Sequence, residues 1–75
     1  MNAVAESVVN LSMNYLGPAA GRFLERQTVG HMNGLLLNNL EKKHLPDLAK
    51  WVKISAGLII DKQKADELAN KIAAL

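Results

Sequence analysis

Residues 45–60, LPDLAKWVKISAGLII, decide the fold class of this chain. Pro46 suits the first position of a helix, where its missing N–H costs nothing, and Asp47 suits the positive end of the helix dipole. Apolar residues then recur at the three- and four-residue spacing that lines one side of a helix. They are Leu45, Leu48, Ala49, Val52, Ala56 and Ile59. The stretch therefore predicts an amphipathic helix with a buried stripe.

The same spacing continues towards the N-terminus, in residues 4–16 and 18–27. Gly17 is a candidate left-handed cap for the first of these helices, and Pro18 suits the first position of the second. Because glycine weakens a helix interior, we expect residues 28–34 to form a joint or a weakened first turn.

Residues 35–43 look helical again, with a leucine stripe, and Asp61 is a good N-cap for a final helix. The buried stripe of that final helix would be Ala65, Leu68, Ala69 and Ile72. The sequence thus predicts an all-α protein, a compact bundle of four to five short helices in one domain, residues 1–75.

The composition is that of a small folded domain. The chain has 75 residues, of which 49% are hydrophobic and 21% charged, and it has no cysteine for a disulfide or a thiolate zinc site. Residues 1–16 lack the basic start of a secretory signal, and the longest apolar run, residues 56–60, is too short to span a bilayer. We therefore expect a soluble, cytoplasmic protein without a membrane partner.

The residues that could support catalysis are few. His31 and His44 are the side chains suited to acid–base or metal chemistry near neutral pH, and neither has a partner at a motif spacing. Glu41 precedes His44 by three residues, which a surface ion pair would explain. No nucleophile elbow or phosphate-binding loop is visible. We therefore expect no enzymatic activity, no cofactor and no metal.

The first forty residues carry only four charges, whereas the rest of the chain carries seven lysines and five acids. So short a chain without crosslinks needs additional burial, and a twofold homodimer is the commonest way to supply it. Consecutive apolar residues at 35–37 and 58–60 cannot all face one core. The predicted interface residues are Leu35, Leu37, Trp51, Leu58 and Ile60. The leading hypothesis is a module for self-association or for binding a protein partner.

Residues 48–64 support a second hypothesis, a helix-turn-helix that binds DNA. Phosphate contacts would then come from Lys50, Lys53, Lys62 and Lys64. The pattern departs from the motif because Lys53 stands where the turn usually has glycine, and residues 57–60 offer no side chain that reads base edges. With a net charge of only +2, nucleic acid is the alternative partner rather than the expected one.

The segment 15-YLGPAA-20, followed by 23-FLER-26, resembles the Y-I-G-P-x-A helical segments at the ends of some prokaryotic signalling proteins. In those proteins the segment belongs to a small all-helical accessory module beside kinase or sensor domains. The resemblance spans residues 15–26 and implies a protein-interaction role accessory to signalling. It carries no functional residue across to this chain.

Overall fold

The computed structural model describes residues 2–75, and every regular element in that range is helical. The α-helices are α1 (Ala3–Leu16), α2 (Ala20–His31), α3 (Leu45–Ala56) and α4 (Lys62–Ala73). Short 3₁₀ turns lie between them, namely η1 (Gly17–Ala19), η2 (Leu37–Asn39) and η3 (Lys42–His44). The predicted all-α class is confirmed.

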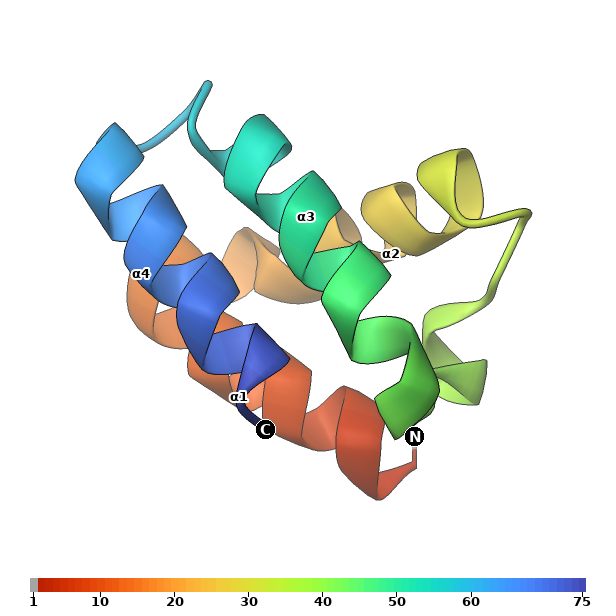
Figure 1. Ribbon diagram of the computed structural model, residues 1–75. Coiled ribbons are helices and arrows are strands. Elements are labelled where there is room, and N and C mark those ends of the chain that lie inside the picture. Colours follow the sequence, from red (N-terminus) through yellow and green to blue (C-terminus); the bar gives the residue numbers. More distant parts are fainter. Residues whose placement is uncertain (1) are drawn as a thin grey trace.

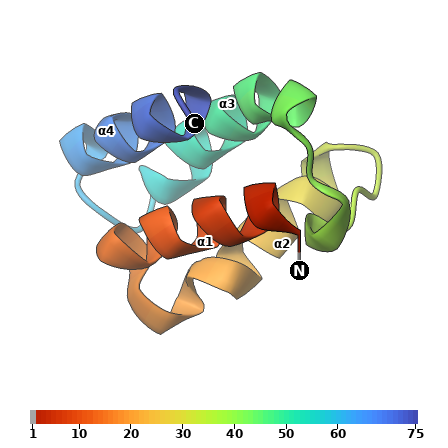
Figure 2. The ribbon, with the colours of Figure 1, turned by 90° about the horizontal axis from the view of Figure 1, so that it is seen from below.

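The helices form two layers around one apolar core. Helices α3 and α4 run side by side in opposite directions, and α1 and α2 lie on the other side of the core (Figure 1, Figure 2). Across the core, α1 contacts α4 and α2 contacts α3. The largest fully buried apolar side chains are Leu24, Leu40, Leu48, Leu68, Ile72, Val8 and Val52. The apolar stripes of α3 and α4 therefore face the interior as the sequence predicts, up to the end of α3.

Two of the predicted helix ends are confirmed. Asp61 caps α4, and its carboxylate accepts a hydrogen bond from the backbone N–H of Gln63 at 3.2 Å. Gly17 ends α1 as predicted but is not the expected left-handed cap, because its φ of +65° and ψ of −151° lie outside the left-handed helical region, in a conformation open to glycine. Pro18 differs from the prediction, because it lies in η1 and α2 begins only at Ala20.

The N-terminal cap of α1 also holds a distant loop. The Asn2 side-chain oxygen accepts from the N–H of Ala5 at 2.7 Å, which satisfies one of the free N–H groups at the start of the helix. The Asn2 amide nitrogen donates to the carbonyl oxygens of Asn38 and Leu40, at 2.7 and 2.9 Å. One side chain thus joins the start of α1 to η2.

The α-helix expected over residues 35–43 is not formed. The described residues therefore hold four α-helices, and the fifth helix of the prediction is absent from them. The backbone is extended at Leu40 and Glu41, with ψ of 134° and 166°, so the segment divides into η2 and η3. The N–H of Leu37, at the start of η2, donates to the Glu25 carboxylate of α2 at 2.6 Å. The leucines then take separate directions: Leu37 and Leu40 are buried and Leu36 is exposed.

The joint expected over residues 28–34 is shorter than predicted. Helix α2 continues through Gly30 to His31, and the chain turns at Asn33 and Gly34, which have φ of +57° and +72°. Thr28, expected in the joint, is fully buried inside α2. Burial of Thr28 in the last turns of α2 therefore outweighs the low helix propensity of Gly30.

A single copy already has the burial expected of a monomer. Its accessible surface is 4540 Å², and the scaling of surface with mass gives about 4,500 Å² for a monomer of 8.2 kDa. Its radius of gyration is 10.7 Å, against about 11 Å for an average domain of this length. The chain is thus as compact as an average monomer of its size, and a dimer is not needed to complete the core.

Candidate interaction surface

Three large apolar side chains, including the two most exposed ones of the described residues, lie where α3 ends and the chain turns towards α4. Leu58 is 83% exposed, Ile59 is 64% exposed and Ile54 is 53% exposed. Lys53 and Lys62 lie beside them. We call these five residues the tip surface. Exposed apolar groups that are gathered and rimmed by charge are typical of interaction sites.

The tip surface exists because α3 ends early. The predicted stripe places Ile59 in the core, and this prediction is wrong because α3 ends at Ala56. In the turn, the N–H groups of Ile59 and Ile60 both donate to the Ala56 carbonyl oxygen, at 3.0 and 2.9 Å. This turn points Ile60 towards the core and leaves Leu58 and Ile59 in solvent.

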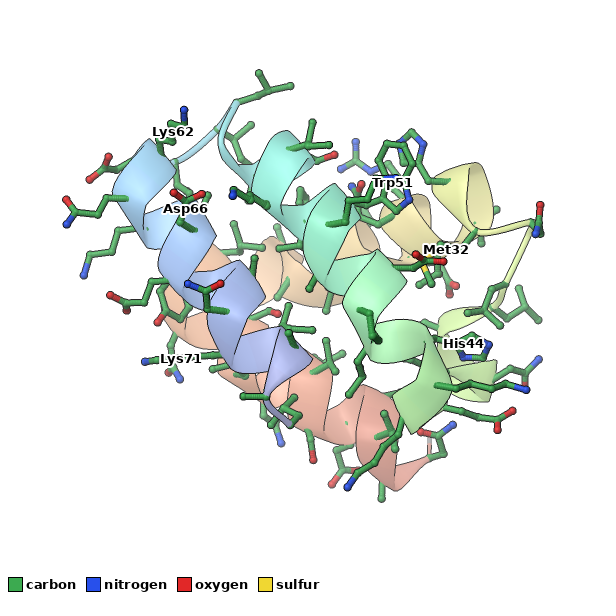
Figure 3. The ribbon with its side chains drawn as sticks, viewed as in Figure 1. Met32, His44, Trp51, Lys62, Asp66 and Lys71 are labelled. Carbon is green, nitrogen blue, oxygen red and sulfur yellow. The ribbon has the colours of Figure 1, made fainter. Side chains whose placement is uncertain are left out.

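A hollow of about 370 Å³ adjoins the tip surface, between the end of α3 and the start of α4. Its lining consists of Lys53, Ile54, Gly57, Leu58, Lys62 and Asp66. A side chain at residue 57 would lie 3.1 Å from the Lys53 carbonyl oxygen, so Gly57 lets the turn stay close to α3. Figure 3 shows Lys62 and Asp66 on the first turns of α4, and both line the hollow.

The charged groups of the hollow have no ion-pair partner in residues 2–75. Within residues 2–75, the ion pair on α4 joins Lys71 to Glu67 at 3.7 Å, and neither residue lines the hollow. Asp66 is half-buried, and its Oδ1 atom is shielded from solvent and receives no hydrogen bond from the described residues. The hollow therefore presents both signs of charge, ready for pairing.

The predicted interface residues do not form one surface. Leu58 lies at the centre of the tip surface, whereas Leu37 is buried in the core. Leu35 and Ile60 are half-buried and pack against the core. Trp51 is half-buried and stacks on His31. Sequence reasoning missed Ile54 and Ile59 as surface residues, although Gly57 as a helix end was the signal that could have exposed Ile59.

The two histidines line a second hollow, of about 360 Å³, together with Asp47. The Nδ1 atom of His44 accepts a hydrogen bond from the backbone N–H of Glu41 at 2.9 Å, in place of the expected ion pair between their side chains. Within residues 2–75, no group of three or more metal-ligating side chains is close enough together to hold an ion. The convergence of His31 and His44 was not visible in their spacing.

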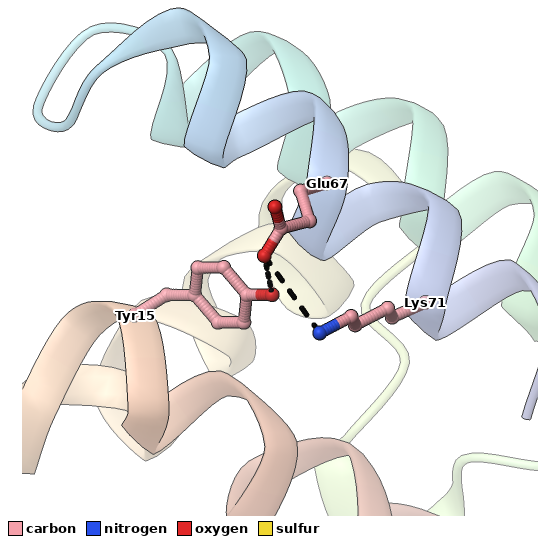
Figure 4. A network of polar contacts seen from close by, with 3 residues as sticks. All are labelled: Tyr15, Glu67 and Lys71. Carbon is pink, nitrogen blue, oxygen red and sulfur yellow. Dashed lines mark hydrogen bonds and ion pairs between the residues drawn. The ribbon is translucent and has the colours of Figure 1, made fainter.

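A polar network joins α1 to α4 on a further face. The Tyr15 hydroxyl donates to the Glu67 carboxylate, which also pairs with Lys71 (Figure 4). The hydrogen bond from Tyr15 and the positive charges of Lys64 and Lys71 lower the pKa of Glu67 below its ordinary value of 4.5. The same contacts with Tyr15 and Glu67 raise the pKa of Lys71. The hydrogen bond between Tyr15 and Glu67 therefore links the two layers on this face.

The four lysines of the DNA-binding hypothesis are not gathered on one face. Lys53 and Lys62 line the hollow beside the tip surface, which we call the tip hollow. Lys64 lines a different hollow between α1 and α4. The Lys50 ammonium lies 4.9 Å from the centre of the Trp51 ring. Lys53, which stands at the turn of the predicted motif, lies within α3, and residues 57–60 are not helical, so the helix-turn-helix expected in this stretch is not formed.

Comparison of the chain with protein-family models, curated proteins and solved structures gave no match. Across residues 2–75, every helix is too short or too polar to traverse a lipid bilayer.

Proposed function

We propose that this chain is a small interaction module that associates with itself through the tip surface. The observation that carries the proposal is the exposure of Leu58 and Ile59, two adjacent large apolar side chains at the end of a helical pair. Leaving them in water costs about 25 cal/mol for each Å² of apolar surface, and a partner removes that cost. A few well-packed side chains near the centre of an interface contribute most of its binding energy.

The size of the tip surface implies weak and reversible association. A standard interface buries about 800 Å² on each partner, close to a fifth of the 4540 Å² surface of this chain. The tip surface has only three apolar residues, so its dimer falls at the small end of that range. We expect a dissociation constant in the micromolar range, and hence a module that assembles only when it is locally concentrated.

The resemblance of residues 15–26 supports an accessory role in signalling. Within the fold, this segment runs from the end of α1 into α2 and places Ala20, Phe23 and Leu24 in the core. It therefore builds the scaffold, while the tip surface makes the contact.

Sedimentation equilibrium from millimolar to low micromolar protein tests the proposal, with L58D as the disruptive variant. Leu36 is also an exposed leucine and lies outside the tip surface, so L36D is the matched control. We expect the wild type and L36D to show the same concentration-dependent mass, and L58D to remain monomeric. A wild type that is monomeric throughout, or equal effects of L36D and L58D, would overturn self-association.

Binding to DNA through residues 48–64 remains the second candidate, favoured by Lys53 and Lys62 on one hollow. It predicts affinity that falls steeply with salt and a loss of binding in the K50E/K53E variant. An apolar dimer instead changes little with salt. Anisotropy of a labelled DNA duplex at two salt concentrations separates the two functions.

A further inference from the structure

We infer that two copies pair about a twofold axis, with Leu58 of each copy in the tip hollow of the other and Lys62 of each copy facing Asp66 of the other. This inference rests on the proposed self-association and adds the geometry of pairing and the residues that orient it.

The first support is shape. Leu58 projects as a knob with 83% of its surface exposed, and it stands on the wall of a hollow of about 370 Å³. In a twofold dimer both copies use the same patch. If one residue of the first copy contacts a second residue of the other copy, the same contact also occurs with the two copies exchanged. A surface with a knob and a hollow side by side satisfies this condition, because each copy supplies what the other receives.

The second support is charge. Lys62 and Asp66 are one helical turn apart on α4 and border the same hollow (Figure 3). Neither has an ion-pair partner within residues 2–75, and Asp66 keeps one shielded oxygen without a donor. The shielded oxygen is covered by its own chain, so an ammonium group of a second copy would approach the other carboxylate oxygen and would lower the cost of the half-buried charge.

Both signs of charge at the hollow favour a second copy over a partner of one sign. An acidic partner would meet Asp66, and a basic partner would meet Lys53 and Lys62. A second copy in twofold register can place each sign against its opposite. Rim pairs of this kind select the orientation of binding, whereas Leu58 and Ile59 supply its strength.

Charge reversal tests the pairing. K62D places like charges across the axis, and so does D66K, so each variant should dimerise about 10-fold more weakly than the wild type, given rim pairs of up to ~1 kcal/mol that occur twice. The double variant K62D/D66K should recover to within about 3-fold of the wild type, because both pairs are restored with exchanged signs. K43D is the matched control, since Lys43 is an exposed lysine in η3, away from the hollow.

A mixing experiment makes the test sharper. When K62D and D66K are mixed, each carries the charges that the other needs, so the mixed dimer should form more tightly than either variant dimerises alone. Energy transfer between differently labelled variants measures this directly, and circular dichroism confirms that each is folded.

The two proposals fail in distinguishable ways. A monomeric wild type rejects self-association itself. A dimer that L58D disrupts, but in which K62D and D66K have no effect or the double variant and the mixture show no recovery, rejects the twofold pairing alone. A monomeric wild type that binds a basic or acidic peptide at this hollow also overturns the second copy as its occupant.

Discussion

The imidazole ring of His31 lies flat against the indole ring of Trp51, with ring centroids 4.1 Å apart and an angle of 9° between the planes. The contact joins the last turn of α2 to the middle of α3. On the same tryptophan, the ammonium group of Lys50 lies 4.9 Å from the ring centre. Trp51 is thus engaged by its own chain, which explains why it does not stand free as the anchor that the sequence predicts.

Replacing His31 with alanine should destabilise the fold by about 1 kcal/mol, because stacked aromatic pairs contribute about 0.5–1.5 kcal/mol beyond their area burial. H31F should keep most of the stability, since a phenyl ring can take the same place against Trp51. Urea unfolding followed by the fluorescence of the single tryptophan measures both variants. Equal stability of H31A and the wild type would show that the stack contributes nothing.

The elements that could be predicted from the sequence are those whose signals are local. Helix α4 follows from the Asp61 cap and a stripe of small and apolar residues, and the end of α1 follows from Gly17. Residues 35–43 were mispredicted because Leu40 and Glu41 are extended, in a segment that distant side chains hold: Glu25 accepts from the Leu37 N–H, and Asn2 donates to the carbonyl oxygens of Asn38 and Leu40. The spacing of apolar residues along the sequence gives no sign of hydrogen bonds between residues that are far apart in the chain.

The candidate site shows the same division. Leu58 could be predicted because three consecutive apolar residues cannot all face one core. The helical spacing predicts Ile59 in the core, but that spacing no longer applies after Gly57, where the chain leaves the helix. The hollow beside Leu58 could not be predicted, because it needs the relative position of α3 and α4.

Asn2 should be worth more than an ordinary helix cap. N2A removes the acceptor for the Ala5 N–H and both donors to the η2 region, so we expect a loss of about 2 kcal/mol, at the upper end for N-caps. N2D keeps the acceptor and removes only the donors. Thermal unfolding should therefore place N2D between N2A and the wild type. If N2A and N2D were equally destabilised, the contact with η2 rather than the cap would dominate.

Ser12 offers a stabilising substitution. Its side chain is completely buried in α1, and its hydroxyl makes no hydrogen bond to any described residue. S12A removes this unpaired polar atom and places the best helix former in the same position, so it should stabilise the protein by about 1 kcal/mol. S12V is the informative comparison, because added volume in a closely packed core offsets that gain. A lower unfolding temperature for S12A would mean that the hydroxyl is paired in solution.

The contact between Tyr15 and Glu67 should make stability depend on pH in the acid range. Folding lowers the pKa of Glu67, first through the hydrogen bond from Tyr15 and then through Lys64 and Lys71. The folded state therefore binds fewer protons at this group than the unfolded chain, and the stabilisation is complete above pH 4.5. It disappears as the pH falls through the lowered pKa.

E67Q cannot ionise, so its stability deficit relative to the wild type should be largest near neutral pH and should shrink as the pH falls below 4.5. Y15F should flatten the pH dependence of the wild type, because the hydroxyl is the largest cause of the shift. Both effects are small, since Glu67 is exposed and solvent screens its charge. Urea unfolding between pH 7 and pH 3 tests them, and a constant difference between the wild type and E67Q over this range would remove Glu67 as the titrating group.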